Sequence, residues 1–299
     1  MKIVLTREIE QVDAAATEFL AQRVERNVLA TLLAQLHAGG RSHPKRLFGW
    51  GKESSGALRF FAMRTPPWPL LVSEVGPREA DELMERWLLE DHRLPGVTGV
   101  PTATRAVATA WRERTQGRWR RRLSEALHVL EEVIDPPHWP SGQLRLAQKG
   151  DRELLGAWER DFQVEASATP GAAIEAQSIV DRRIARRAQF VWDDGGPVST
   201  LGLNIPIAAT VRIGPVFTPR EHRGRGYASA AVACACRQML ADGARRCMLF
   251  TDLENATSNK IYAAVGFRRH CDWEELEFLP GSDVTRARAR PGVSRFTRR

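Results

Sequence analysis

The fold of the C-terminal half is decided by the stretch Val216-Phe217-Thr218-Pro219-Arg220-Glu221-His222-Arg223-Gly224-Arg225-Gly226-Tyr227-Ala228-Ser229. This stretch predicts a strand that runs into a glycine-containing loop, and the loop opens directly into a helix of small residues. The first turn of a helix carries unpaired N–H groups and about half a positive charge. We therefore expect the main chain at 224–229 to form a phosphate or pyrophosphate site, with Arg220 or Arg225 placed to meet further phosphates.

Two other phosphate-binding loops match this segment poorly. A Rossmann dinucleotide loop needs glycine where Ser229 stands, a tight turn directly after the strand and an early position in its domain. A nucleoside triphosphate loop needs Lys and then Ser or Thr after the last glycine, where this sequence has Tyr227 and Ala228. A glycine-assisted turn into a helix without any ligand stays open as the plain structural alternative.

A second informative segment, 254–267, follows a predicted buried strand. Asn255 is a good helix N-cap and Gly266 a good C-terminal stop, so a short helix is predicted between them. One face of that helix carries polar residues spaced by three or four positions: Asn255, Ser258, Asn259 and Tyr262. Such a polar stripe is unusual on a helix that packs. The structural alternatives are plain capping for Asn255 and an amphipathic position at a domain edge for Tyr262.

Together the two segments resemble the GNAT superfamily of acetyl-coenzyme A dependent N-acetyltransferases. The run Arg223-Gly224-Arg225-Gly226-Tyr227-Ala228 fits the loop R/Q-x-x-G-x-G/A of that family, and 255–267 is similar to its second cofactor segment. The order of strand, loop, helix, strand, short helix and strand also agrees. The resemblance is strong over 205–280 and weaker over 143–204. Over 1–135 it rests on a similar element order alone, which suggests a degenerate first copy in a tandem arrangement.

The resemblance implies an N-acetyltransferase that moves an acetyl group from acetyl-CoA to a primary amine by direct attack. Tyr262 would be the catalytic general acid on the CoA thiolate, and the Val216 N–H would stabilise the oxyanion. Backbone groups of the strand would pair with the pantetheine arm. The residues implied to bind the cofactor are Val216, Phe217, Thr218, Arg223, Gly224, Arg225, Gly226, Tyr227, Ala228, Ser229, Asn255, Ser258 and Asn259.

The general base is not assigned by the sequence. Many family members have a glutamate on the central strand, but Val211, Arg212 and Ile213 offer no carboxylate there. Glu165 and Asp252 are possible bases, and neither is chosen over the other. In the N-terminal half, the stretch 94–99 stands where a pyrophosphate loop would be expected and lacks the motif. We therefore expect that half not to bind the cofactor in the usual way.

The length of 299 residues favours two modest domains. Three prolines and a glycine at 135–142 mark the seam. We predict a degenerate GNAT-like or accessory domain at 1–135, a catalytic GNAT domain at 143–280 and a basic, flexible tail at 281–299, in an α/β fold with a mixed sheet. The patterns predict helices over 12–36, 78–90, 102–115, 151–165, 178–187, 227–240 and 256–265, and strands over 58–63, 70–75, 124–133, 144–147, 188–192, 198–205, 211–217, 247–253 and 271–278.

The net charge of +8 is concentrated at the end of the chain, because residues 283–299 hold six arginines and one aspartate. The rest of the chain is close to neutral, which favours a solvated tail over a nucleic-acid or membrane arm. No apolar run approaches the roughly 20 residues of a membrane span, so the cytoplasm is the expected location. The four cysteines show no zinc-type spacing with histidine, and no metal is expected.

Two other classes of function stay open. The first is a non-catalytic acyl-CoA-binding module in which the N-terminal half is an interaction domain. The second is a nucleic-acid binder that uses Arg223, Arg225 and the terminal arginines, which the nearly neutral body disfavours. Neither the acceptor nor the oligomeric state follows from the sequence, and protein amino groups, small amines and aminoglycosides all remain candidate acceptors.

Overall fold

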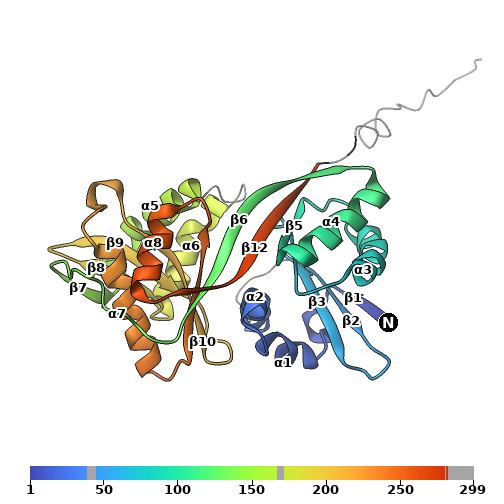
Figure 1. Cartoon of the computed structure of the whole chain (residues 1–299), viewed down its shortest axis with the longest axis horizontal. Helices are drawn as coiled ribbons and strands as arrows, with labels where there is room; N and C mark the ends of the chain where they lie inside the picture. The colour runs from blue at the N-terminus through green and yellow to red at the C-terminus, as the bar shows by residue number, and fades with distance from the viewer. Residues whose placement is uncertain (39–44, 167–171, 280, 282–299) are drawn as a thin grey trace, which may run out of the picture.

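The computed structural model describes residues 1–38, 45–166, 172–279 and 281. Its strands form one 12-stranded sheet in the order β1-β2-β3-β4-β5-β12-β6-β11-β10-β9-β8-β7. The β4–β5 and β10–β11 pairs are parallel, and the other pairs are antiparallel. Helices cover both faces, with the N-terminal half at one end of the sheet and the C-terminal half at the other (Figure 1). This architecture confirms the predicted α/β fold with a mixed sheet.

The N-terminal half begins with a strand and two short helical turns before its first long helix. Its elements are β1 (Lys2–Thr6), η1 (Ile9–Gln11), α1 (Ala15–Ala21), η2 (Val24–Arg26), α2 (Asn27–His37), β2 (Leu47–Lys52), β3 (Leu58–Arg64), β4 (Leu70–Val72), α3 (Pro77–Glu90), β5 (Gly96–Gly99), α4 (Pro101–Thr115) and β6 (Arg118–Leu130).

The C-terminal half follows a similar order after a linker at 135–142 that contains no helix or strand. Its elements are β7 (Gln143–Leu146), η3 (Lys149–Asp151), α5 (Arg152–Glu165), α6 (Ala172–Ala185), β8 (Gln189–Asp193), β9 (Pro197–Leu203), β10 (Thr210–Phe217), η4 (Arg220–His222), α7 (Tyr227–Ala241), β11 (Arg246–Asp252), α8 (Ala256–Val265) and β12 (Arg268–Leu279).

The two halves exchange their last strands. β12, the last strand of the C-terminal half, lies between β5 and β6, and β6, the last strand of the N-terminal half, lies between β12 and β11. The two strands cross the middle of the molecule side by side (Figure 1). Arg120 donates to Glu277 across this pair at 2.6 Å, and Arg122 pairs with Glu275. Each half therefore completes its sheet with a strand that the other half supplies, and a division at 135 and 143 stays a prediction.

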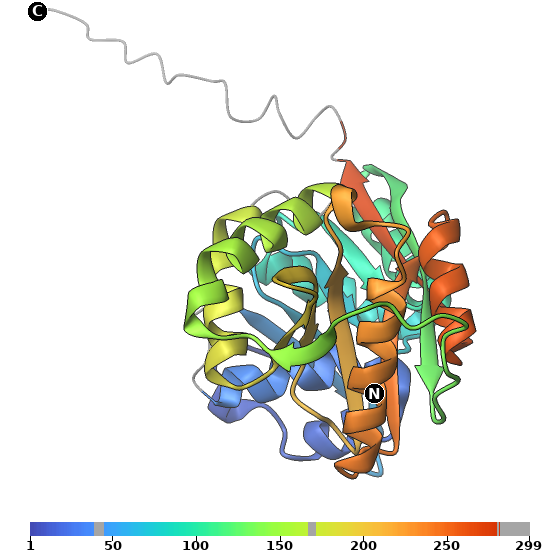
Figure 2. The ribbon, with the colours of Figure 1, turned by 90° about the vertical axis from the view of Figure 1, so that its left-hand side faces the viewer.

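Helix α7 and the short helix α8 pack on the face of the C-terminal sheet opposite α5 and α6 (Figure 2). The fully buried residues of α7 are small: Ala230, Ala231, Val232, Ala233, Ala235 and Cys236. Small side chains let the helix approach the strands closely, which fixes its first turn relative to β10. Among the described residues, no helix has the length and apolar character needed to cross a membrane.

Several predicted elements differ from the structure. The region 12–36 is not one helix, because η2 interrupts it between α1 and α2. Strands β1, β2 and β5 were not predicted. The stretch 94–99 is not the counterpart of a pyrophosphate loop: it contains β5, and the loop that connects a strand to the following helix lies earlier, at 73–76. The basic tail 281–299 lies outside the described residues except for Gly281.

Candidate functional site

The parallel strands β10 and β11 pair only at their beginnings. Ladder pairs join Thr210 to Arg246 and Arg212 to Met248, and beyond them no pair between the two strands is found in the described sheet. On its other side β10 continues to pair with β9, through Val216 opposite Leu201. The edge of β10 that faces β11 is therefore open near Val216, so an extended ligand has room to pair there as a strand would.

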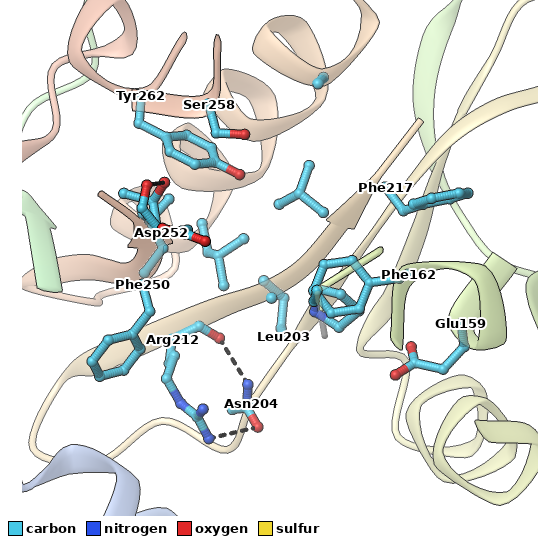
Figure 3. Close-up of a pocket in the computed structure, with 18 of the residues that line it drawn as sticks. Glu159, Phe162, Leu203, Asn204, Arg212, Phe217, Phe250, Asp252, Ser258 and Tyr262 are labelled. Atoms are coloured by element: carbon cyan, nitrogen blue, oxygen red, sulfur yellow. Dashed lines mark hydrogen bonds between the residues drawn. The ribbon is translucent and has the colours of Figure 1, made fainter. Parts of the chain in front are cut away.

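A cavity of about 1250 Å³ extends through this opening. On the C-terminal side it is lined by β10, the start of α7, α8, β11, α5 and α6. The N-terminal half lines the rest, through α2, β4, β5 and β6, with Trp273 of β12 beside them. Figure 3 shows side chains from α5, β9, β10, β11 and α8 around the cavity. Both halves of the chain therefore build its walls.

The loop before α7 has the backbone shape that a diphosphate site requires. Gly224 and Gly226 have φ angles of +77° and +85°, a left-handed conformation that favours glycine. A Cβ atom added at Gly224 would meet nothing within 4 Å, so the space above the loop is open. Helix α7 begins at Tyr227, directly after Gly226, and its first N–H groups are available to an anion. These residues fit the pyrophosphate of a CoA thioester.

Side chains around the loop hold it in place. Arg223 donates to the carbonyl of Thr218 at 2.8 Å and to the Glu165 carboxylate at 2.7 Å. The Tyr227 hydroxyl donates to Asp194 at 2.6 Å, which ties the start of α7 to the turn between β8 and β9. A loop fixed in this way loses little conformational freedom when it binds a ligand.

Most of the residues expected to bind the cofactor line the cavity. They are Val216, Phe217, Thr218, Arg223, Gly224, Gly226, Tyr227, Ala228, Ser229, Asn255 and Ser258. Asn255 caps α8 as predicted, because its side chain accepts the Ser258 N–H at 3.0 Å. Two residues lie elsewhere. Arg225 is exposed and does not line the cavity, and Asn259 donates to the carbonyl of Asp252 at 2.9 Å, where it stabilises the end of β11.

Tyr262 is nearly buried on α8, and its hydroxyl points toward the cavity beside Ser258 (Figure 3). No described residue forms a hydrogen bond with that hydroxyl. Burial raises the pKa of Tyr262 to about 12. The phenol therefore keeps its proton at neutral pH and is available as a donor.

Glu125 is a cavity residue that the sequence analysis did not find. It lies on β6, opposite Asp252 of β11 and Trp273 of β12. Burial, together with the negative charges of Asp252 and Glu275, raises the pKa of Glu125 to about 7. A carboxyl group with this pKa can accept a proton at neutral pH. A signal was present in the sequence, since Glu125 is the one acid in the 13-residue strand β6.

The two carboxylates considered from the sequence have different surroundings. Glu165 lines the cavity near the glycine loop and is engaged by Arg223 at 2.7 Å and Arg220 at 3.6 Å. Asp252 lies near Tyr262 at the end of β11, and its side chain accepts the Glu254 N–H at 2.9 Å (Figure 3). Glu165 is therefore engaged in ion pairs, whereas Asp252 lines the cavity near Tyr262.

Arg212 stands on the central strand at the position where no carboxylate was found. Its Nη2 donates to Asn204 Oδ1 at 3.2 Å, and Asn204 Nδ2 donates back to the Arg212 carbonyl at 3.3 Å (Figure 3). Its Nε is buried without a partner among the described residues. Burial, followed by the positive charge of Arg183, lowers the pKa of Arg212 to about 10, so the group stays charged at neutral pH.

Comparisons with known proteins agree with this geometry. A GNAT acetyltransferase from Colwellia psychrerythraea is 12% identical and has a TM-score of 0.58, over 94% of this chain and 100% of that one. A GCN5-related N-acetyltransferase from Sphaerobacter thermophilus is 18% identical, with a TM-score of 0.58 over 93% and 96%. A tandem GNAT protein from the clavulanic acid biosynthesis pathway is 13% identical, with a TM-score of 0.54 over 93% and 98%.

At such low identities these three structures show the fold alone. No significant match was found among curated proteins. The sequence itself matches the model of the Acetyltransferase (GNAT) family over residues 152–267, which includes the glycine loop and Tyr262. The chain therefore contains a GNAT acetyltransferase domain, and the GNAT fold of solved structures extends over both of its halves.

Proposed function

We propose that this protein transfers an acetyl group from acetyl-CoA to a primary amine. The observation that carries the proposal is one continuous cavity, which reaches from the N–H groups of the glycine loop through the opening between β10 and β11 to the hydroxyl of Tyr262. Acetyl-CoA supplies the acetyl group activated as a thioester. The cavity offers a separate feature for each part of that molecule.

Binding of the donor is assigned to the main chain of β10 and α7. The N–H groups at 224–229 hold the pyrophosphate, and the open edge of β10 near Val216 pairs with the pantetheine arm. Ser258 and Asn255 line the same channel from α8. This arrangement directs the thioester toward Tyr262. It leaves the part of the cavity that α2 and α6 line for the acceptor.

The catalytic steps are assigned to three groups. Glu125 accepts the proton that the attacking amine loses, since its pKa is about 7. The Val216 N–H stabilises the negative charge that develops on the acetyl oxygen. Tyr262 donates its proton to the departing sulfur, because its raised pKa keeps it protonated until then.

An acetyl-CoA turnover screen across a broad amine library, with free thiol as the readout, tests the proposal. We expect thiol release that depends on the amine and falls sharply in Tyr262→Phe. Acetyl-CoA binding measured by calorimetry, with no acetyl transfer to any amine, would assign the non-catalytic acyl-CoA-binding module instead. Absence of both binding and turnover would exclude both functions.

A further inference from the structure

The acceptor part of the cavity is rich in arginine. Helix α6 and its end provide Arg182, Arg183 and Arg186, and β10 provides Arg212. Arg183 is bonded to Glu159 of α5 at 2.9 Å, and Arg182 donates to the Ser178 hydroxyl at 3.1 Å. The amine acceptor of a transferase is itself positively charged until it loses a proton. The cavity is also lined by acidic residues, but a buried guanidinium such as that of Arg212 is unfavourable for an acceptor that carries nothing except its amine.

Arg212 is a buried cation, and the described residues occupy few of its donors. A guanidinium group has five N–H donors, and the described residues occupy one of them, through the neutral amide of Asn204. The Nε donor is buried and has no partner in the part of the chain that the structure describes. No described acidic side chain forms an ion pair with Arg212. A buried charge in this state is costly unless a ligand supplies the missing anion.

Glu125 does not fill that role. Its charge acts on Arg212 through space and raises the pKa of the arginine, but burial outweighs this effect. Glu125 itself has a pKa of about 7, so it is only partly ionised at neutral pH. It is also the group assigned to accept the proton of the amine, and it is neutral once it has done so. Asp252 lies at the Tyr262 end of the cavity.

We propose that Arg212 binds an anionic group on the acceptor, so that the substrates are amines that also carry a carboxylate or a phosphate. This inference rests on the proposed acetyl transfer and specifies its acceptor. The anion neutralises Arg212 and takes up N–H donors that the described residues leave without partners. The amine of the same molecule then faces Glu125 and Tyr262 across the cavity. Arg212 is a binding residue in this scheme and takes no part in proton transfer.

Matched acceptors test the proposal. Three amines of equal chain length are compared: an ω-amino carboxylate, its neutral amide and the aminoalkyl phosphate. Because the acid group is several bonds from the amine, its replacement leaves the basicity of the amine nearly unchanged. For the wild type we expect kcat/KM to be at least about tenfold higher for one of the acids than for the amide, a difference of about 1.4 kcal/mol. Whichever acid is preferred identifies the anion.

Substitution of the arginine is expected to remove that preference. Arg212→Met should lower kcat/KM for the acids to the level of the amide, mainly through KM, and Arg212→Gln should do the same with a polar side chain in place. Circular dichroism checks that each variant is folded. Arg237→Met is the control, because Arg237 pairs with Asp135 outside the cavity. Equal rates for all three amines in the wild type, or an unchanged preference in both Arg212 variants, would overturn the proposal.

Calorimetry separates this inference from the proposed function. Binding of the amino acid without acetyl-CoA is expected in the wild type and in Arg237→Met, and it should be lost in Arg212→Met. If no amine is acetylated but this binding pattern holds, the transferase function is wrong and the anion site stands. If amines are acetylated but the acid binds Arg212→Met as well as it binds the wild type, the anion site is wrong and the transferase function stands.

Discussion

The two halves share one order of strands and helices, but only the C-terminal half keeps the features of a phosphate site. The loop between β10 and α7 has two glycines in the left-handed conformation. The loop between β4 and α3 places Gly76 at an ordinary φ of −84° and Pro77 at the first helical position, where an N–H group is absent. Glu79 lies in the first turn of α3 and adds negative charge there. Repetition of a fold therefore does not repeat its chemistry.

The halves also differ at the opening between their parallel strands. β4 is only three residues long, and Gly99 at the end of β5 approaches it so closely that an added Cβ would lie 2.7 Å from the Val72 carbonyl. The N-terminal sheet is closed at the place where β10 and β11 separate. The seventh residue of α8 is Tyr262, whereas the seventh residue of α4 is the fully buried Val107. The described part of the N-terminal half therefore has neither the channel between the parallel strands nor a tyrosine at the position of Tyr262.

The largest expected effect is the loss of acetyl-CoA binding when a glycine of the loop before α7 is replaced. Gly226→Val should abolish acetyl-CoA binding, because a β-branched residue is strained in the left-handed conformation and disturbs the first turn of α7. Gly76→Ala is the matched control in the N-terminal half, where the φ angle is ordinary and an added Cβ would meet the flexible Glu79 carboxylate. Calorimetry should show wild-type affinity for the control. Wild-type affinity in Gly226→Val would remove the loop from the binding site.

The second prediction concerns Tyr262 of α8, which has no tyrosine counterpart on α4. Tyr262→Phe removes the proton donor and should lower kcat by about 10² to 10⁴-fold, while the dissociation constant for acetyl-CoA changes little. The ring still fills the same space, so the free energy of unfolding should also stay close to that of the wild type. Stopped assays of thiol release, together with calorimetry, measure the two quantities. Unchanged turnover would show that the sulfur leaves without help from Tyr262.

The sequence predicts the C-terminal half better than the N-terminal half for a physical reason. Local patterns predict the order β10, α7, β11 and α8: apolar residues alternate, Asn255 caps α8 and Gly266 ends it. Gly266 has a φ of +109°. Strand β2 was missed because its glycines look like a turn. Gly49 is needed because Trp87 and Leu5 press against the strand, and an added Cβ would lie 2.7 Å from Leu5.

Local sequence patterns do not predict the site residues that are brought into place by the exchanged strands. Glu125 meets Asp252 only because β6 pairs with β11, more than a hundred residues later in the chain. No spacing rule in one segment reveals such a contact. Asn259 was assigned from its place in a polar stripe; in the structure its side chain donates to the Asp252 carbonyl at the end of β11, and its role toward a ligand stays a prediction. Arg225 was assigned for its charge; it is exposed and does not line the cavity.

The third prediction tests whether the N-terminal half contributes a catalytic group. If Glu125 is the base, kcat/KM of the wild type rises with pH through about 7 as the carboxyl ionises. Glu125→Gln should lower kcat/KM at pH 8 by roughly 10²-fold and remove this rising limb. Glu275→Gln is the companion variant: it removes a neighbouring negative charge that raises the Glu125 pKa, so the limb should move to lower pH. A limb that persists in Glu125→Gln would assign the base to another group.

The smallest expected effect is on stability. The folded state raises the pKa of Glu125 from 4.5 to about 7, so ionisation of this group opposes folding. The penalty is absent below pH about 4.5 and complete above pH about 7, where it reaches roughly 3 kcal/mol. Glu125→Gln never ionises, so its free energy of unfolding should exceed that of the wild type at pH 8 and approach it at pH 5. Urea unfolding at both pH values measures the difference. A carboxyl group that lowers the stability of the folded protein when it ionises is expected of a catalytic residue. Equal stability of the wild type and Glu125→Gln at pH 8 would mean that the N-terminal half supplies a strand to the site and no carboxyl group with a raised pKa.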